Sequence, residues 1–156
     1  MSFAPSRRSA LLLALSASLG LAACGGGGGD SGTPVNQDPN GWNLVTALKT
    51  TDTVVGTGVA AAAGKKATVN YSLWLYDVRA ADTKGTFIES GSFQFTLGTT
   101  PLQVITGFDQ GVTGMKVGGK RTITIPASLA YGATGSAPKI PANAALVFDV
   151  ELTGVN

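Results

Sequence analysis

The segment Gly107–Leu152 constrains the fold more than any other part of this chain of 156 residues. Its apolar and aromatic residues recur partly at strand spacing and partly at helix spacing, with a loop rich in Tyr and Gly between two strand-like stretches. This pattern fits a sheet that wraps around a helix. The chain contains no His, and its only Cys is Cys24, so the segment offers no nucleophile with a partnered base. Any activity is therefore expected to depend on shape and hydrogen bonding.

Several stretches alternate apolar and polar residues with the period of a half-buried strand. The residues expected on the buried face are Val69, Tyr71, Leu73, Leu75, Phe93, Phe95, Leu97, Ile123, Ile125, Leu146, Phe148, Val150 and Leu152. Leu44–Lys49 and Thr53–Val55 are predicted to be two further short strands, and Asp77–Gly85 is predicted to be a loop. Phe108–Met115 has apolar residues at helical spacing and is followed by two glycines, which predicts a short helix.

Many short strands and one helix predict an α+β domain, in which an antiparallel, twisted sheet wraps around one short α-helix. The predicted folded domain covers residues 42–156.

The N-terminus is predicted to be a lipoprotein signal peptide over residues 1–23. Arg7 and Arg8 supply a basic region, Ala10–Leu21 is an apolar run too short to span a bilayer, and Leu21-Ala22-Ala23-Cys24 is similar to a bacterial lipobox. Acylation at Cys24 is therefore expected, and a plain secretory signal is the alternative. The lone Cys has no disulfide partner, which favours the anchor. Gly25, in place of Asp, favours the outer membrane, so the predicted location is the bacterial envelope, facing the periplasm.

Residues 24–41 are predicted to be the lipidated Cys and a flexible tether, because five consecutive glycines and then mainly polar residues offer little to bury. A tether of this length would reach about 20–25 Å root-mean-square. Without Arg7 and Arg8 the chain has nine basic and nine acidic residues. This balance argues against nucleic acid as a partner, since phosphates require a basic surface.

Residues 54–152 resemble the FKBP-type peptidyl-prolyl cis-trans isomerases, which bind the macrolides tacrolimus and rapamycin. The stretches that carry the resemblance are Val104–Phe108, Gly111–Gly118, Ile125-Pro126, Leu129–Gly132, Ile140-Pro141 and Leu146–Leu152. The resemblance implies rotation of X–Pro bonds in proline-containing polypeptides, without a cofactor or metal. Amide resonance sets a barrier of about 18–20 kcal/mol to this rotation. An apolar site that favours the twisted amide over the planar one can lower the barrier without any nucleophile.

The resemblance also implies which residues form the pocket. The predicted catalytic residues are Tyr71, Phe87, Ile105, Phe108, Tyr131 and Phe148, and the predicted substrate-binding residues are Phe93, Val104 and Ile140. Among them, Phe108 stands at the pocket floor, where many members have Trp. In the family the main-chain N–H of the residue matching Ile105 and the hydroxyl of the Tyr matching Tyr131 donate hydrogen bonds to ligand carbonyls.

Simple structural roles are the alternative for several aromatic and charged residues. Phe95 and Val150 are interpreted as core, and for Phe148 a core role and a site role stay equally open. Tyr131 precedes Gly in a loop, where packing gives no reason for an aromatic residue, so a site role is favoured. Lys120 and Arg121 are interpreted as an exposed strand end rather than as an anion site.

One departure from the family pattern bears on activity. Many members have Phe-Asp-Ser where this chain has Phe87-Ile88-Glu89-Ser90. Ile88 cannot replace the Asp as an acceptor, and in a regular strand Glu89 would point to the opposite face. An irregular backbone that brings Glu89 back is the alternative. Lys139 also adds a charge where compact members often have an apolar residue. Two hypotheses follow: an active envelope isomerase that assists folding, or a catalytically weak module that binds proline-containing segments.

Overall fold

The computed structural model describes residues 38–156, and its elements follow one another as a strand-rich chain with a single α-helix. The elements are a 3-10 helix Trp42–Leu44, β1 Lys49–Val54, β2 Lys66–Tyr76, β3 Lys84–Thr96, α1 Thr106–Val112, β4 Lys120–Ile125, a second 3-10 helix Ala127–Leu129, and β5 Leu146–Val155. The predicted signal peptide, Cys24 and most of the predicted tether lie outside the described residues.

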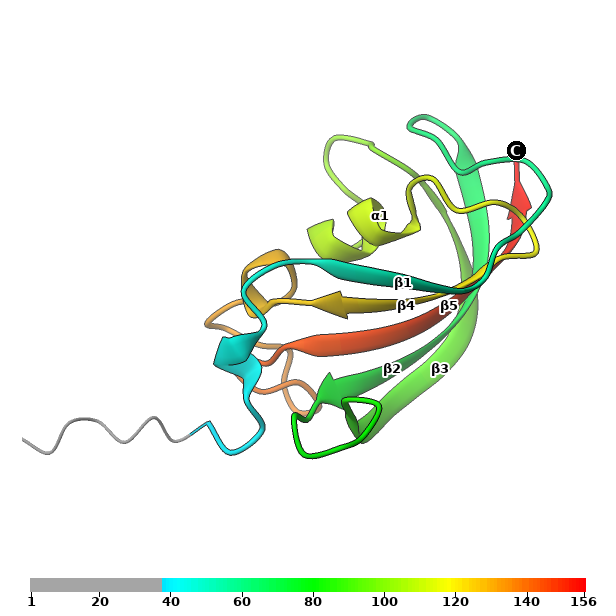
Figure 1. The fold of residues 1–156 in the computed structure, drawn as a ribbon. Coiled ribbons are helices and arrows are strands. Elements are labelled where there is room, and N and C mark those ends of the chain that lie inside the picture. Colours follow the sequence, from blue (N-terminus) through cyan, green and yellow to red (C-terminus); the bar gives the residue numbers. More distant parts are fainter. Residues whose placement is uncertain (1–37) are drawn as a thin grey trace, which may run out of the picture. The chain divides into compact units, whose positions relative to one another are not determined.

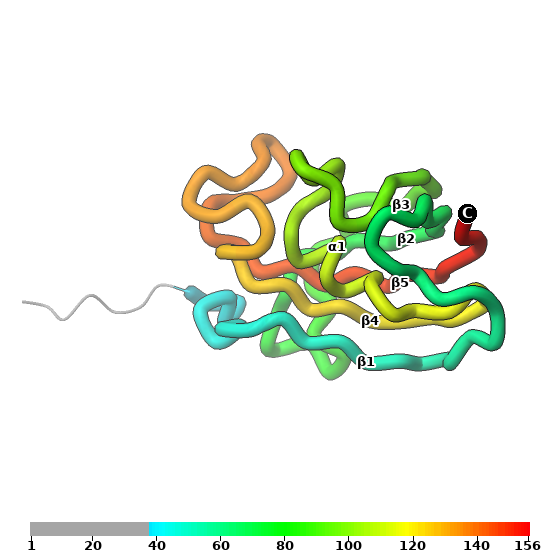
Figure 2. The backbone as a smooth tube through the Cα atoms, turned by 90° about the horizontal axis from the view of Figure 1, so that it is seen from above, coloured from blue at the N-terminus to red at the C-terminus, as the bar shows by residue number. Residues whose placement is uncertain are grey.

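The five strands form one antiparallel sheet in the order β1-β4-β5-β2-β3. The sheet is twisted and curved, and α1 lies against one of its faces (Figure 1). Seen from above, α1 lies within the curve of the sheet (Figure 2). We call the face that carries α1 the inner face and the opposite one the outer face. The predicted α+β fold is confirmed.

The alternating residues occupy the face expected for them. In β2, Val69 and Leu73 are buried, while Tyr71 and Leu75 are half-buried and pack against the same core. Every predicted inward residue of β4 and β5 is buried: Ile123, Ile125, Leu146, Phe148, Val150 and Leu152. Phe95 is also buried, so its interpretation as core is confirmed. The inner face thus carries the hydrophobic core.

The helix is shorter than predicted and is displaced toward the N-terminus, from Phe108–Met115 to Thr106–Val112. It ends before Gly114, whose φ of 82° is in the left-handed region that favours glycine. Phe108, Val112 and Met115 all lie in the core, although Met115 stands three residues after the end of the helix. Periodicity therefore located the apolar residues correctly but not the end of the helix.

Two glycines bring α1 close to β4. A Cβ atom at Gly111 would lie 2.6 Å from Cγ2 and 2.7 Å from Cδ1 of Ile123, which real side chains do not tolerate. A Cβ atom at Gly107 would overlap the side chain of Ile125. Because these two glycines are one helical turn apart, they form the face of α1 that contacts the sheet. The close approach sets how far Phe108 extends into the core.

The N-terminal part of the domain differs from the prediction. Leu44–Lys49 is not a strand: a 3-10 helix covers Trp42–Leu44, and β1 begins at Lys49 and runs through Thr51-Asp52 without a break. All residues of this edge strand are exposed, so no hydrophobic pattern marked it. Pairing with β4 and a bidentate ion pair between Asp52 and Arg121, with Nε–Oδ1 at 2.6 Å, position it instead.

The last residues of the predicted tether contact the domain. The main-chain N–H of Val78 donates to the carbonyl of Asn40, and the guanidinium of Arg79 donates to the Asn40 side chain at 2.7 Å. The indole N–H of Trp42 donates to the carbonyl of Tyr76 at 2.8 Å. Between residues 38 and 156, no helix has the length and hydropathy that crossing a membrane requires.

Candidate functional site

Four of the predicted site residues form an aromatic cluster on the inner face. Tyr71 comes from β2, Phe93 from β3, Phe108 from α1 and Phe148 from β5. The ring centroid of Phe108 lies 5.0 Å from that of Phe148, 5.7 Å from that of Phe93 and 6.5 Å from that of Tyr71. Tyr71 meets Phe93 edge-on at 5.3 Å. Such edge-on and tilted pairs are favourable arrangements for aromatic rings.

The cluster is closed at its base and open at its rim. Phe108 is 2% exposed and Phe148 is 5% exposed, so both lie at the base. Tyr71 and Phe93 are only half-buried and pack over them. Phe108 therefore lies where the predicted pocket floor should be. Phe148 is at once a core residue and part of the base, which accounts for both interpretations of it.

The residues just before α1 supply an apolar edge and a main-chain donor. Val104 and Ile105 are partly buried against the core. Ile105 caps the helix, and its carbonyl accepts from the N–H of Phe108 at 3.0 Å and of Asp109 at 3.2 Å. Within residues 38–156, no hydrogen bond involves the main-chain N–H of Ile105. That N–H remains able to donate to a ligand, as the resemblance implied.

The loop after the second 3-10 helix holds Tyr131 at the surface and Ile140 in the core. Tyr131 is 39% exposed, whereas Ile140 is 7% exposed. Two hydrogen bonds between Ser136 and Ile140, of 2.8 and 2.9 Å, close the tip of this loop. The loop therefore joins a fixed apolar residue to a tyrosine whose hydroxyl is accessible.

Phe87 does not join the cluster, and its predicted place in the pocket wall is corrected. Its ring packs at 5.8 Å from Trp74, and it is 54% exposed. Trp74 belongs to the polar side of the β2 alternation, and the ammonium of Lys84 lies 5.0 Å above its ring. Phe87 is thus part of the outer face, together with a tryptophan and a lysine.

A β-bulge at Ile88 explains the correction. Leu73 pairs with Glu89 while Trp74 pairs with Phe87, so Ile88 is an extra residue in β3. Ile88 packs against the core, and the Glu89 side chain returns to the same face. The hydroxyl of Tyr71 donates to Glu89 Oε1 at 2.9 Å. Ile88-Glu89-Ser90 therefore fits the family's Phe-Asp-Ser pattern, with Ile88 as wall residue and Glu89 as carboxylate.

The sequence places Glu89 on the outer face for a regular strand and on the inner face only for an irregular one, and β3 is irregular at this point. A strict strand period would place it on the outer face, and no signal in the local sequence marks the bulge. The only available hint was the family triplet itself, shifted by one residue. Gly91, the cross-strand partner of Tyr71, leaves room for the ring, since a Cβ there would lie 3.3 Å from Tyr71 Cε1.

Glu89 also links β3 to the loop that carries Tyr131 through an ion pair. The ammonium of Lys139, in the loop that carries Tyr131, lies 3.3 Å from Glu89 Oε2. Burial, the hydrogen bond to Glu89 and the charge of Glu89 raise the pKa of Tyr71 above its ordinary value. Burial and the same charge raise the pKa of Tyr131. Both phenols are therefore neutral donors at physiological pH.

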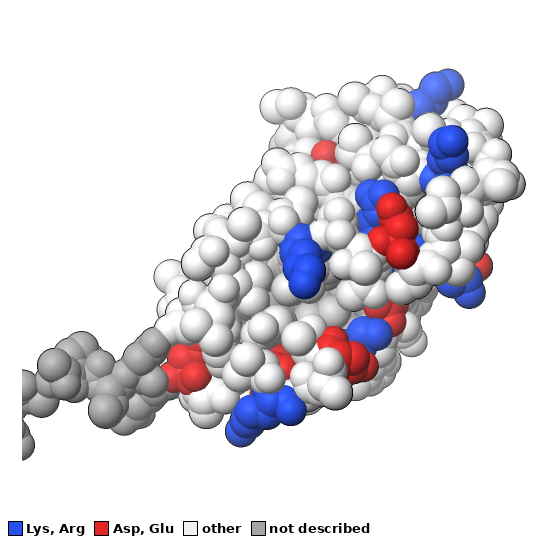
Figure 3. All heavy atoms as spheres, viewed as in Figure 1, with Lys and Arg blue, Asp and Glu red and all other residues white. Residues whose placement is uncertain are grey.

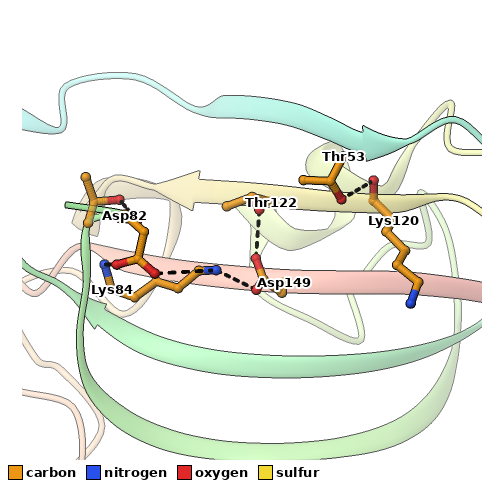
Figure 4. Close-up of polar contacts among 7 residues, drawn as sticks. Thr53, Asp82, Lys84, Lys120, Thr122 and Asp149 are labelled. Atoms are coloured by element: carbon orange, nitrogen blue, oxygen red, sulfur yellow. Dashed lines mark hydrogen bonds and ion pairs between the residues drawn. The ribbon is translucent and has the colours of Figure 1, made fainter. Parts of the chain in front are cut away.

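An open groove of about 350 Å³ lies elsewhere, on the outer face of the sheet. There Asp149 accepts from Lys84 Nζ at 2.6 Å and from Thr122 Oγ1 at 2.7 Å, while Thr53 donates to the Lys120 carbonyl (Figure 4). The hydrogen bonds of these groups are made with one another, and the groove holds no His or Cys. We place the site in the aromatic cluster because, among the described residues, this cluster combines an apolar base with available hydrogen-bond donors.

Several of the remaining charges form pairs of mixed sign. Lys120 lies 3.6 Å from Glu151 and is exposed, which fits its interpretation as an exposed strand end, whereas Arg121 pairs with Asp52 and its side chain is only 13% exposed. Basic and acidic side chains are interspersed over the face shown in Figure 3. In the part of the chain that the structure describes, no three His, Cys, Asp or Glu side chains gather as a metal site would need.

Comparisons with known proteins point to one family. The sequence model of the FKBP-type peptidyl-prolyl cis-trans isomerases matches residues 58–153. An FK506-binding protein of Neisseria meningitidis serogroup C is 44% identical over 98 residues, which cover 63% of this chain and 86% of that protein. The 39 kDa FK506-binding nuclear protein of Drosophila melanogaster is 43% identical over 123 residues, and the match spans 79% of this chain but only 33% of that longer protein.

The fold has a counterpart among solved structures. The crystal structure of a peptidyl-prolyl cis-trans isomerase from Pseudomonas syringae pv. tomato superposes with a TM-score of 0.58 at 29% sequence identity. The superposition covers 70% of this chain and 75% of that one. Sequence and fold thus point to the same family.

Proposed function

The chain belongs to the family of FKBP-type peptidyl-prolyl cis-trans isomerases, and on this premise we propose that it accelerates the rotation of X–Pro bonds in polypeptides. The observation that carries the proposal is the half-open aromatic cluster, with Phe108 at its base and two available donors at its rim. A proline ring is apolar and fits such a surface. The donors are the N–H of Ile105 and the hydroxyl of Tyr131.

The proposed mechanism is noncovalent. A planar amide is more polar than a twisted one, so removing water around the bond in an apolar pocket disfavours the ground state. Hydrogen bonds from Ile105 and Tyr131 to substrate carbonyls hold the chain on both sides of the rotating bond. Interactions that are better made with the twisted amide lower the barrier, whereas uniform binding would not. No step needs a base, which fits a chain without His.

The position of Glu89 favours catalysis over the alternative of a weak binding module. That alternative depended on the lack of an acceptor at Ile88. Glu89 accepts from the Tyr71 hydroxyl at 2.9 Å and so fixes the ring that forms one wall of the pocket. The departure at Ile88 therefore gives no reason to expect weak activity.

The experiment is a proline-peptide isomerisation assay with the purified protein, with and without tacrolimus. Uncatalysed isomerisation takes tens to hundreds of seconds, so acceleration is easily resolved. We expect acceleration that tacrolimus inhibits, and the same competition with rapamycin. A rate equal to the uncatalysed one, combined with measurable peptide binding, would favour the binding module instead.

For the cellular setting, we propose a lipid anchor at Cys24 that holds the domain at the periplasmic side of a bacterial outer membrane. Support comes from the basic residues Arg7 and Arg8, the apolar run Ala10–Leu21 and the lipobox-like sequence that ends at Cys24. In this setting the substrates would be exported polypeptides whose folding waits on proline isomerisation.

A further inference from the structure

Glu89 and Lys139 form the ion pair that joins β3 to the loop carrying Tyr131, beside the half-buried Tyr71, and we call this open side of the aromatic cluster the pocket mouth. Lys139 is the sole charged residue in the loop region 126–145, and the segment 97–107 before α1 contains none. Glu89 faces Lys139 from β3, with Nζ and Oε2 3.3 Å apart. The electrostatic character of the mouth is therefore set by this one pair.

The two partners are held very differently. Glu89 is fixed by the hydrogen bond from Tyr71, at 2.9 Å, and its side chain is 43% exposed. The Lys139 side chain is 59% exposed, and its ammonium makes a single hydrogen bond in the described structure although it has three donors. The backbone beneath it does not move freely, because the next residue, Ile140, is buried and paired with Ser136. Lys139 is thus an exposed cation with unused N–H groups on a backbone that is held by the hydrogen bonds of Ile140.

We propose that Lys139 is a specificity-determining residue, which selects substrates with an acidic side chain next to the proline. A substrate carboxylate can accept a hydrogen bond from an unused N–H of the Lys139 ammonium, or it can replace Glu89 as the partner of Lys139. A basic substrate side chain gains less, because both oxygens of Glu89 already accept a hydrogen bond, whereas two of the three ammonium N–H groups of Lys139 are unused in the described structure. This inference rests on the proposed function, since it assigns a preference to the same pocket.

The expected preference is modest, because Lys139 is well exposed to solvent. An exposed ion pair contributes little, so kcat/KM should favour Glu over Gln by roughly two- to fivefold. The preference should fade at about 1 M salt, where charges are screened beyond roughly 3 Å. Lys in place of Gln should give no gain.

The test compares proline peptides that differ only in one residue, Glu, Gln or Lys, placed before the proline in one series and after it in another. Both kcat/KM and the dissociation constant Kd are measured with the purified full-length protein. Lys139→Gln should remove the preference for Glu, and Lys139→Glu should reverse it in favour of Lys. Lys116→Gln is the matched control, because Lys116 precedes β4 at the end of that strand opposite the loop region 126–145.

The outcomes separate this inference from the proposed function. If the neutral peptide is accelerated but neither series shows a charge preference, Lys139 has no role in specificity. If nothing is accelerated, the proposed function fails, and the order of Kd values for Glu, Gln and Lys peptides still decides the inference. An equal effect of Lys116→Gln would mean that overall charge, and not Lys139, causes the preference, which would overturn the inference.

Discussion

Glu89 shows how a single extra residue changes which side chains can interact. The bulge at Ile88 brings the carboxylate to the face where the Tyr71 hydroxyl donates to it at 2.9 Å. In exchange, Phe87 pairs with Trp74 on the outer face. One local irregularity in β3 therefore determines the face of the sheet on which Phe87, Ile88 and Glu89 lie.

The charge of Glu89 predicts a pH dependence of stability. Burial, together with Glu89, raises the pKa of Tyr71, and it does so for Tyr131 as well. Below about pH 10 both phenols are protonated in the folded and unfolded states, so the stability that depends on neutral phenols is fully present. Above that pH the unfolded chain ionises first, and the free energy of unfolding falls until the folded pKa values are passed.

Glu89→Gln should reduce this alkaline loss, because the amide can still accept from Tyr71 but carries no charge. The measurement is the urea midpoint from about pH 8 to about pH 11, which spans the ordinary tyrosine pKa. Glu151→Gln serves as the control, since Glu151 pairs with Lys120 and not with a tyrosine. Identical curves for wild type and Glu89→Gln would show that Glu89 does not act on either phenol.

Tyr131→Phe should weaken the binding of tacrolimus with little change in stability. The Tyr131 hydroxyl makes no hydrogen bond within the described residues, and the residue is 39% exposed, so its removal leaves the fold intact. One lost hydrogen bond costs about 0.5–1.5 kcal/mol, which raises Kd roughly two- to twelvefold. Titration calorimetry and urea unfolding measure the two quantities. An unchanged Kd would count against the assigned role.

At the level of elements, the contact between α1 and β4 depends on glycines in the helix. Ala at a helix interior is usually about 1 kcal/mol better than Gly. At Gly111, however, the added Cβ would lie 2.6 Å from Ile123, and such overpacking costs about 1–3 kcal/mol. Packing therefore outweighs helix propensity at this position.

Gly111→Ala should lower the free energy of unfolding by up to about 2 kcal/mol, because the cost of overpacking offsets and can exceed the gain in propensity. Chemical denaturation measures it. Gln110→Ala, on the exposed side of α1, is the control and should change stability by less than about 0.5 kcal/mol. Adding Ile123→Val removes the Cδ1 contact and should recover part of the loss. A double variant with purely additive losses would show that Gly111 and Ile123 do not conflict.

Strands with a buried side were predictable from the sequence, and the edge elements were not. β2 and β5 carry alternating apolar residues because one face of each is buried. β1 has no buried residue, so only its pairing with β4 defines it. The same limit applies to the site. The inward faces of Tyr71, Phe93, Phe108 and Phe148 followed from strand and helix periods, and their place in a pocket followed from the family resemblance. The bulge at Ile88 breaks the strand period, so the position of Glu89 could not be predicted in this way.

At the scale of the whole molecule, the chain combines a compact domain with a predicted anchor that is separate in sequence. The domain from residue 38 onward contains every side chain proposed to bind substrate. Cys24 lies outside the described residues, fourteen positions earlier in the chain. The proposed chemistry of the pocket therefore does not depend on the proposed acylation.

This separation yields a prediction for Cys24→Ser in a bacterial expression host. A serine hydroxyl cannot receive the thioether-linked lipid, so the variant should carry no fatty acid and should not partition with membranes. Its isomerase activity should equal that of the acylated protein, because the aromatic cluster and Glu89 are unchanged. Mass spectrometry of the N-terminal peptide and the proline-peptide assay measure the two properties. Fatty acid detected on the variant would refute the lipobox interpretation, whereas an altered rate would show that the anchor acts on the pocket after all.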